Sequence, residues 1–293
     1  MSLFALSLVL VAALLHAVWN VVAKKAGGDS RFSLLLTLFM VVLWSPLGLW
    51  LAWEAVPRWG WVEWTAVVAS GAANLAYFHT LLRGYARSDL SVVYPVARGT
   101  GPLLASLGAL LLLGESMSWF GGVGLLLVVV GIFLVAGGTA VWIRVNDSEQ
   151  RARVIAGVGW GAATGLFIAT YTLIDGYVIK VLAVQPVLYT YFCNVVRLPM
   201  HMPAGLRDLP GFVSACRAQW KHALLIAVIA PTAYVLVLYA VQLAPLSHVA
   251  PAREVSMLFA ALLGGKLLGE GDRGLRIVGA AFIALGVAGL ALG

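Results

Sequence analysis

Two arginines and a glutamate stand out because they lie near the middle of long apolar segments. Arg98 belongs to the segment 90–113, and Arg253 and Glu254 belong to the segment 248–268. If such a segment crosses a bilayer, a charge at its centre costs at least about 2.5–3.5 kcal/mol. Guanidinium groups there favour a clamp for a carboxylate, a phosphate or another polar end of a substrate, while Glu254 could take an amine or a proton. The structural alternative is that the arginines neutralise Glu254 or contact helix ends.

A second group of candidates lies along one face of the segment 154–176. Its members recur every three or four residues, as on one side of a helix: Gly157, Trp160, Thr164, Ile168, Tyr171 and Asp175. Small, aromatic and acidic side chains on one face are typical of a cavity wall, although helix packing, with Asp175 near the lipid headgroups, is the alternative. In the first apolar segment, His16, Trp19 and Asn20 form a similar face.

Further polar and aromatic residues lie in the segments 64–83 and 90–113. Tyr77 and His79 are on different faces of the first, and a histidine inside a membrane can relay protons near neutral pH. Tyr94 precedes Arg98 by one turn, so both point the same way. The predicted substrate-binding residues are therefore Trp19, Asn20, Tyr77, His79, Tyr94, Arg98, Trp160, Tyr171, Asp175, Arg253 and Glu254. Weaker candidates are Tyr189, Asn194, Arg197, Tyr234 and His248.

The apolar segments that hold these residues dominate the composition. Of 293 residues, 62% are hydrophobic and 11% are charged, whereas a soluble domain is roughly 45–50% apolar and about 25% charged. This excludes a soluble enzyme, a disulfide scaffold and a disordered chain, and it indicates an all-α integral membrane protein. We expect ten transmembrane helices, at about 3–23, 32–53, 64–83, 90–113, 118–138, 154–176, 184–203, 222–242, 248–268 and 274–292. Pro95, Pro231 and Pro251 can kink theirs.

Residues 94–138 and 251–293 repeat each other. Four pairs are each 155 positions apart: Arg98 and Arg253, Glu115 and Glu270, Gly124 and Gly279, and Gly131 and Gly286. The glycine pairs are expected to be close-packing seams, and the glutamates to stabilise the N-termini of the helices that follow them. The repeat divides the chain into halves of five spans, 1–138 and 154–293, joined by a polar linker at 139–153. Because five is odd, the halves must be inverted, which predicts a central cavity between two inverted five-helix repeats.

Three sequence patterns are specific to one family. They are ALLHAVWNVVAKK at 13–25, ATYTLIDGYVI at 169–179, and a proline followed by Gly-Glu in both halves, at Pro95 and Gly114-Glu115 and at Pro251 and Gly269-Glu270. In these patterns the chain resembles the EamA-like branch of the drug/metabolite transporter superfamily. The resemblance implies a ten-helix bundle that works by alternating access, often for export, with both termini in the cytoplasm.

The basic residues predict the opposite orientation. Although the formal net charge is +7, most Lys and Arg side chains lie in loops after odd-numbered spans, and the even-numbered loops hold few besides Arg58 and Lys180. The positive-inside rule therefore predicts that both termini lie outside. The two orientations stay open at this point.

These observations predict a secondary transporter, acting as an exporter of a small polar metabolite such as an amino acid or amine, in a bacterial inner membrane. Proton coupling through Glu254, Asp175 or His79 is one possibility, and simple facilitation is the other. No phosphate-binding loop or metal-ligand motif is visible, so we expect no cofactor and no metal. The expected partners are the substrate, protons and the lipid bilayer, with no nucleic acid, and the chain is expected to be a monomer or weak dimer. The alternative is a membrane-embedded enzyme acting on a lipid or isoprenoid phosphate.

Overall fold

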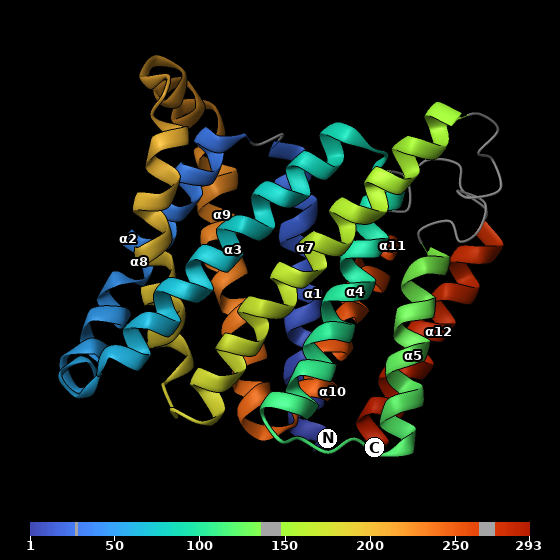
Figure 1. Cartoon of the computed structure of the whole chain (residues 1–293). Coiled ribbons are helices and arrows are strands. Elements are labelled where there is room, and N and C mark those ends of the chain that lie inside the picture. The colour runs from blue at the N-terminus through green and yellow to red at the C-terminus, as the bar shows by residue number, and fades with distance from the viewer. Residues whose placement is uncertain (27–28, 136–147, 264–272) are drawn as a thin grey trace.

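The computed structural model describes residues 1–26, 29–135, 148–263 and 273–293, and these residues form helices and no strands. The first helices are α1 (Leu3–Ala26), α2 (Ser30–Ala55), the short 3-10 helix η1 (Val56–Arg58), α3 (Trp61–Arg87), α4 (Leu90–Leu112) and α5 (Trp119–Val135). The later ones are α7 (Ser148–Lys180), α8 (Pro186–Gly205), α9 (Leu209–Leu243), α10 (Leu246–Ala252), the 3-10 turn η2 (Arg253–Val255), α11 (Ser256–Leu263) and α12 (Arg273–Leu292). The predicted all-α class is confirmed (Figure 1).

Five of the described helices are long and apolar enough to cross a membrane, judged by length and composition. They are Leu3–Ala23, Ser30–Arg58, Ser91–Leu112, Ser148–Lys180 and Leu209–Leu243, and two shorter apolar helices are Trp119–Val135 and Ile277–Leu292. Two helices begin well before their predicted spans. The helix α9 starts at Leu209 and therefore includes Arg217 and Lys221, and α7 starts at Ser148, within the predicted linker. The remaining linker residues, 139–147, lie outside the described residues.

The segment predicted as one span at 248–268 changes from α-helix to a 3-10 turn and back, while Ala252, Arg253 and Ser256 keep right-handed helical dihedrals, in line with the irregularity expected at Pro251. The α-helix α10 ends at Ala252, the chain makes a 3-10 turn through Arg253–Val255, and α11 follows. Pro251 has no N–H, so the carbonyl of Ser247 one turn earlier loses its helical donor. The hydroxyl of Ser106 on α4 donates to that carbonyl at 2.9 Å, which makes the irregularity tolerable in a buried position. Residues 264–268 lie outside the described part of the chain.

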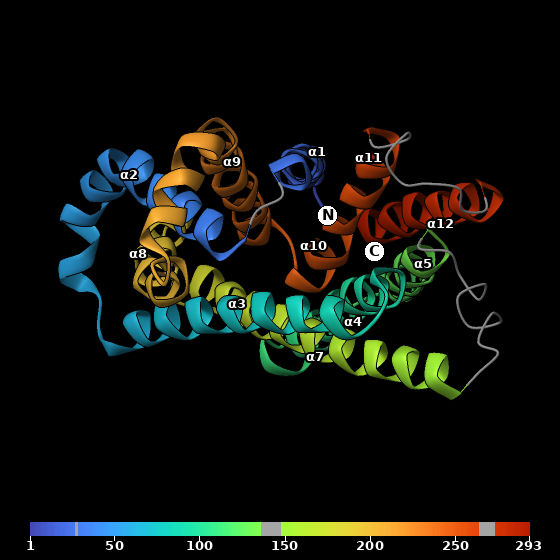
Figure 2. The same cartoon turned by 90° about the horizontal axis from the view of Figure 1, so that it is seen from above.

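The helices pack in pairs that join the two halves of the sequence. The helix α5 packs on α12, α2 on α8, α7 on both α3 and α4, and α9 and α11 on α1 (Figure 2). Both ends of the chain lie at the same end of the bundle (Figure 1), where the Met1 ammonium donates to the carbonyl of Ala291 at 2.7 Å. The ends of the two halves are therefore held together directly.

Glycines bring α5 and α12 into backbone contact. A Cβ atom on Gly124 would lie 2.6 Å from the carbonyl oxygen of Gly286, and one on Gly131 would lie 2.7 Å from that of Gly279. Since the lower number in α5 meets the higher number in α12, the two helices are antiparallel. Small residues let membrane helices approach closely enough for extensive van der Waals contact. The predicted glycine seam is confirmed.

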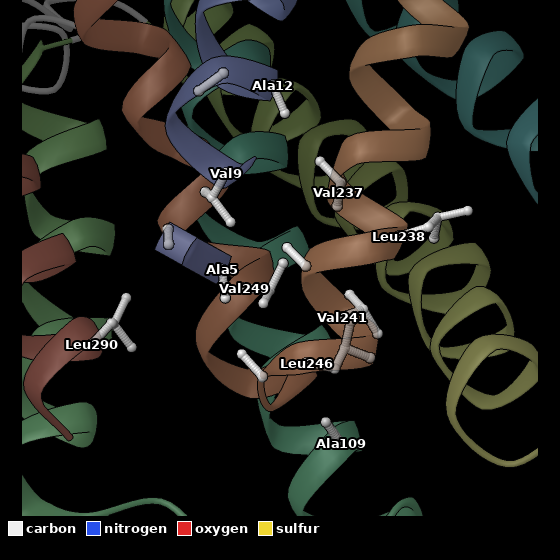
Figure 3. Packing of buried hydrophobic residues seen from close by; sticks show 14 of the residues in the cluster. Ala5, Val9, Ala12, Ala109, Val237, Leu238, Val241, Leu246, Val249 and Leu290 are labelled. Carbon is white, nitrogen blue, oxygen red and sulfur yellow. The ribbon is translucent and has the colours of Figure 1, made fainter. Parts of the chain in front are cut away.

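Apolar side chains fill the end of the bundle that holds the termini. Ala5 and Val9 of α1 pack in one buried cluster with Val241 of α9 and with Leu246 and Val249 of α10 (Figure 3). Each of these side chains is at most 2% exposed. This dense packing closes the bundle at that end.

Glu115 joins three elements at the same end. Gly114, with φ of +65°, ends α4 in a turn that leads to Glu115. The Glu115 carboxylate accepts hydrogen bonds from Lys180 Nζ (2.7 Å) and from the backbone N–H groups of Leu246 (2.7 Å) and Ser247 (2.8 Å). Burial disfavours its ionised form, but these hydrogen bonds outweigh burial and lower the pKa of Glu115 below its usual value. Glu115 thus stabilises the N-terminus of α10 rather than that of the helix that follows it, and Glu270 lies outside the described residues.

Candidate functional site

The 3-10 turn η2 between α10 and α11 faces α4, and an ion pair joins the two halves of the chain there. Arg98 Nη2 of α4 lies 2.7 Å from Glu254 Oε2 of η2, although these atoms are not aligned as a hydrogen bond. The same nitrogen donates to Ser256 Oγ at 3.2 Å. The Glu254 side chain is only 1% exposed, so its charge depends on this guanidinium for compensation.

Arg253 is buried beside this pair but is not matched by it. Its Nε lies 4.0 Å from Glu254 Oε1, which is too far for a hydrogen bond, and it has no hydrogen-bond partner among the described residues. The single carboxylate of Glu254 is therefore the only acid near two guanidinium groups among the described residues. We call Arg98, Arg253 and Glu254 the arginine cluster. It carries one positive charge in excess, and no other acid of the described chain lies within 4.0 Å of either arginine.

Aromatic rings from four helices surround the arginine cluster. The ring of Tyr94 lies 5.9 Å from Arg98 Cζ, and the rings of Tyr77 and Tyr171 meet edge to face at 6.1 Å. The charge of Arg98 acts on all three tyrosines, and the charges of both arginines act on the His16 ring. Of the predicted residues, Tyr77, Tyr94 and Tyr171, on α3, α4 and α7, therefore lie near the arginine cluster.

The predicted face on α1 is held together within its own helix. Trp19 Nε1 donates to His16 Nδ1 at 3.2 Å, which requires the His16 proton to be on Nε2. The Asn20 side-chain amide donates to the carbonyl of His16 at 2.7 Å. These bonds fix the orientation of the His16 and Trp19 rings, while the Asn20 N–H group is not used between helices.

A second polar group surrounds Asp175 on α7. Asp175 Oδ1 accepts hydrogen bonds from Ser70 Oγ and Tyr189 Oη, each at 2.5 Å, and Oδ2 accepts one from the Tyr234 hydroxyl. These donors come from α3, α8 and α9. We call Asp175, Ser70, Tyr189 and Tyr234 the aspartate cluster. Asp175 is 3% exposed, and no Lys or Arg of the described residues lies within 4.0 Å of its carboxylate.

The positive charge of Arg197 also acts on Asp175, without a direct contact. Its guanidinium donates to Asn74 Oδ1 at 2.7 Å and to Asn194 Oδ1, so two neutral amides hold it between α3 and α8. Asp175 and Arg197 thus compensate each other at longer range, without direct contact.

Four predicted residues are brought to neither cluster. Trp19 packs against an apolar group formed by Phe32, Leu35, Ala223 and Ile226, and the Asn20 amide bonds within its own helix. The other two are His79 and Trp160. His79 is exposed, and its Nδ1 pairs with the carbonyl of Leu75 in the same helix at 2.9 Å. Trp160 lies under the guanidinium of Arg87, with 5.3 Å between Arg87 Cζ and the ring centroid. Both therefore contact the outer part of α3 or its C-terminal end.

Three serines belong to the site or support it but were not predicted from the sequence. Ser70 donates to Asp175, Ser256 accepts from Arg98, and Ser106 donates to the carbonyl freed by Pro251. A serine in an apolar segment is common and carries no charge or motif. The only available signal was the position of Ser256, one turn after Arg253.

The described residues contain no group of three or more His, Cys, Asp or Glu side chains that could hold a metal ion. Comparisons with known proteins give two findings. A sequence model of the EamA-like transporter family matches residues 3–137. A solved structure, described only as a crystal structure of a protein, is similar with a TM-score of 0.71 and 16% sequence identity, over 98% of this chain and 96% of that chain. At this identity the likeness is one of fold alone. No curated protein matches the sequence.

Proposed function

Through residues 3–137 the chain belongs to the EamA-like transporter family of the drug/metabolite transporter superfamily, and on this premise we propose that it is a secondary transporter that exports a small polar metabolite such as an amino acid or amine. Its family and its long apolar helices make it an integral, multi-pass membrane protein. The observation that carries the proposal is the arginine cluster, in which buried charges from both halves meet at the 3-10 turn η2. In transporters built from inverted repeats, substrate sites typically lie where the two repeats meet.

The proposed architecture is two inverted five-helix repeats, 1–138 and 154–293, around a central cavity. Contacts between helices support it because they occur in matching pairs. The contact of α3 with α7 corresponds to that of α9 with α1, and the contact of α4 with α7 corresponds to that of α11 with α1. The glycine seam shows the same exchange. Replacing each residue by its repeat mate turns the contact of Gly124 with Gly286 into the contact of Gly279 with Gly131, and both contacts are present. Such exchange is what a two-fold axis between the halves requires.

Alternating access then opens and closes the two ends of the bundle in turn. The conformation described here is closed at the end that holds the termini, by the apolar cluster of α1, α9 and α10 and by Glu115. Opening that end requires α10 to leave Glu115. The turn after Pro251 supplies a place where α10 can move relative to α11.

We assign proton coupling to Asp175 rather than to Glu254 or His79. Glu254 is already compensated by Arg98, and His79 is exposed on the outside of α3. The donors of Asp175 come from both halves, Ser70 from the first and Tyr189 and Tyr234 from the second. A movement between halves would remove the Ser70 hydrogen bond and alter the preference of Asp175 for its proton. The titratable or charged groups that face Asp175 are Tyr189, Cys193, Arg197 and Tyr234.

For the membrane orientation we propose that the face opposite the termini is cytoplasmic, in a bacterial inner membrane. The C-terminal end of α3, with exposed Arg87, and the connection between α8 and α9, with exposed Arg207, lie on that face (Figure 1), as the positive-inside rule requires. A single cysteine at position 207, in a chain without Cys193 and Cys216, tests the orientation. An impermeant maleimide applied from the periplasm should not label Arg207→Cys, and labelling would reverse the orientation.

Transport itself is tested with the purified chain in liposomes. Counterflow of radiolabelled amino acids and of the amines made from them by decarboxylation should exceed that in protein-free liposomes for at least one compound. Arg98→Ala, which removes the ion pair between the halves, should abolish this flux. If no compound moves faster than in protein-free liposomes, the proposed function is wrong.

A further inference from the structure

We propose that Arg253 binds the carboxylate of the transported molecule, so that the site accepts amino acids and rejects the corresponding amines. This inference rests on the proposed transport function and makes its substrate class specific. It starts from the different environments of the two repeat mates, Arg98 and Arg253.

Arg98 Nη2 has two close partners, whereas Arg253 has only a distant contact with Glu254 and no hydrogen-bond acceptor among the described residues. Arg98 contacts Glu254 at 2.7 Å and Ser256 at 3.2 Å, whereas the nearest acceptor charge to Arg253 is 4.0 Å away. Arg253 is nevertheless only 7% exposed. A buried guanidinium without an acceptor is costly, and such a group in a folded protein requires an explanation. A ligand that supplies the missing acceptor provides one.

The number of charges selects a carboxylate. The arginine cluster has one positive charge in excess, which a single negative charge neutralises. A carboxylate carries that charge and can accept two parallel N–H bonds from a guanidinium. A phosphate monoester carries about −1.5 to −2 at pH 7 and would leave the cluster negative. An amine without a carboxylate would add a second unmatched positive charge and be repelled.

The surroundings of the arginine cluster also suit the other end of an amino acid. The Tyr94 ring lies 5.9 Å from Arg98 Cζ, within the arginine cluster. Tyr77 meets Tyr171 edge to face beside the cluster. An ammonium group over tyrosine rings is stabilised by their quadrupoles. A zwitterion can therefore place its carboxylate at Arg253 and its ammonium at these rings.

Matched pairs of compounds test the inference. We would compare phenylalanine with phenethylamine, tyrosine with tyramine, tryptophan with tryptamine and lysine with cadaverine, both in counterflow and as stabilisers in thermal unfolding. The wild-type chain should favour at least one amino acid over its amine by about tenfold or more, the scale of one charged hydrogen-bonded contact. Arg253→Gln should reduce this ratio to near one, and Arg253→Lys should retain part of it.

The apparent melting temperature without any added compound supplies an independent control. Arg253→Gln removes an unmatched charge and leaves the Arg98–Glu254 pair intact, so its melting temperature should equal or exceed that of the wild type. Arg98→Gln, the matched variant of the repeat mate, separates Glu254 from its partner and should melt at a lower temperature. A large loss of stability in Arg253→Gln would contradict an unmatched Arg253.

The outcomes separate the inference from the proposed function. Binding of an amino acid but not its amine, without flux of any compound, would support the Arg253 site and overturn transport. Flux of an amine as fast as its amino acid, or discrimination that survives Arg253→Gln, would overturn the inference and leave transport standing. Neither binding nor flux of any compound would overturn both.

Discussion

The arginine cluster and the aspartate cluster are both buried and both join the two halves, but they use their hydrogen-bonding capacity differently. Asp175 receives three hydroxyl donors, distributed over both carboxylate oxygens. In the arginine cluster, the Nε atoms of both guanidinium groups have no acceptor, and two positive charges share one carboxylate. A cluster whose partners are all present can fix helices or exchange a proton, whereas one with an unused donor and excess charge is suited to a ligand.

The largest expected effect comes from removing the only acid of the arginine cluster. Glu254→Gln would leave Arg98 and Arg253 buried together without an anion, and we expect it to lower the free energy of unfolding by about 3–5 kcal/mol. Thermal unfolding in detergent measures this loss. The double variant Arg98→Gln/Glu254→Gln should recover part of it, because it leaves one buried charge instead of two. Wild-type stability in Glu254→Gln would show that the excess positive charge is not a cost.

In the aspartate cluster, Asp175→Asn should have a smaller effect on stability and a larger one on coupling. The amide can still accept hydroxyl protons, so we expect a loss of about 1–3 kcal/mol. In liposomes with an imposed pH gradient, accumulation should be lost while counterflow continues, because exchange needs no net proton movement. Tyr189→Phe, which removes one donor and keeps the carboxyl, serves as the control. Equal loss of accumulation and counterflow would indicate a structural role alone.

Glu115 extends the comparison to a carboxylate at the end of the bundle. Its pKa is lowered by Lys180 and the backbone N–H groups of Leu246 and Ser247. Its stabilisation is therefore complete above the usual glutamate pKa of about 4.3, and it is lost as the pH falls below that value toward the lowered pKa. Thermal unfolding at pH 6 and pH 3.5 should show this loss, at about 1–2 kcal/mol, in the wild type. Glu115→Gln should be less stable at pH 6 and change less between the two pH values.

The smallest expected effects come from one serine in each cluster. Ser70→Ala and Ser256→Ala each remove a single hydrogen bond and should cost about 0.5–1.5 kcal/mol. Their consequences for transport should differ. Only Ser70→Ala should change the pH dependence of accumulation, because Ser70 contacts Asp175, whereas Ser256 contacts Arg98. An identical pH dependence in the two variants would remove the functional distinction between the clusters.

Residue type and helical spacing predicted most of the arginine cluster and its surroundings. Charges in apolar segments were found because each is individually rare, and Arg98, Arg253 and Glu254 do meet. Tyr77, Tyr94 and Tyr171 were found from helical spacing, and they lie around the arginine cluster. His79 follows the same rules of residue type but is on the exposed face of α3. The sequence pattern placed Tyr77 and His79 on different faces of α3, but it did not show which of these faces is packed against other helices.

The sequence by itself determined the apolar helices and the repeat, together with the glycines that let α5 and α12 touch. These features depend on local composition and on spacing along one helix. Only the tertiary structure decided that Glu254 pairs with Arg98 and leaves Arg253 unmatched, and that hydroxyls from three other helices surround Asp175. It also decided which proline changes the geometry of its helix, since α4 and α9 continue as α-helices through Pro95 and Pro231 while the segment with Pro251 tightens into a 3-10 turn. The physical reason is that buried charges and freed carbonyls must find partners across helices, and those partners are set by packing rather than by spacing along the chain.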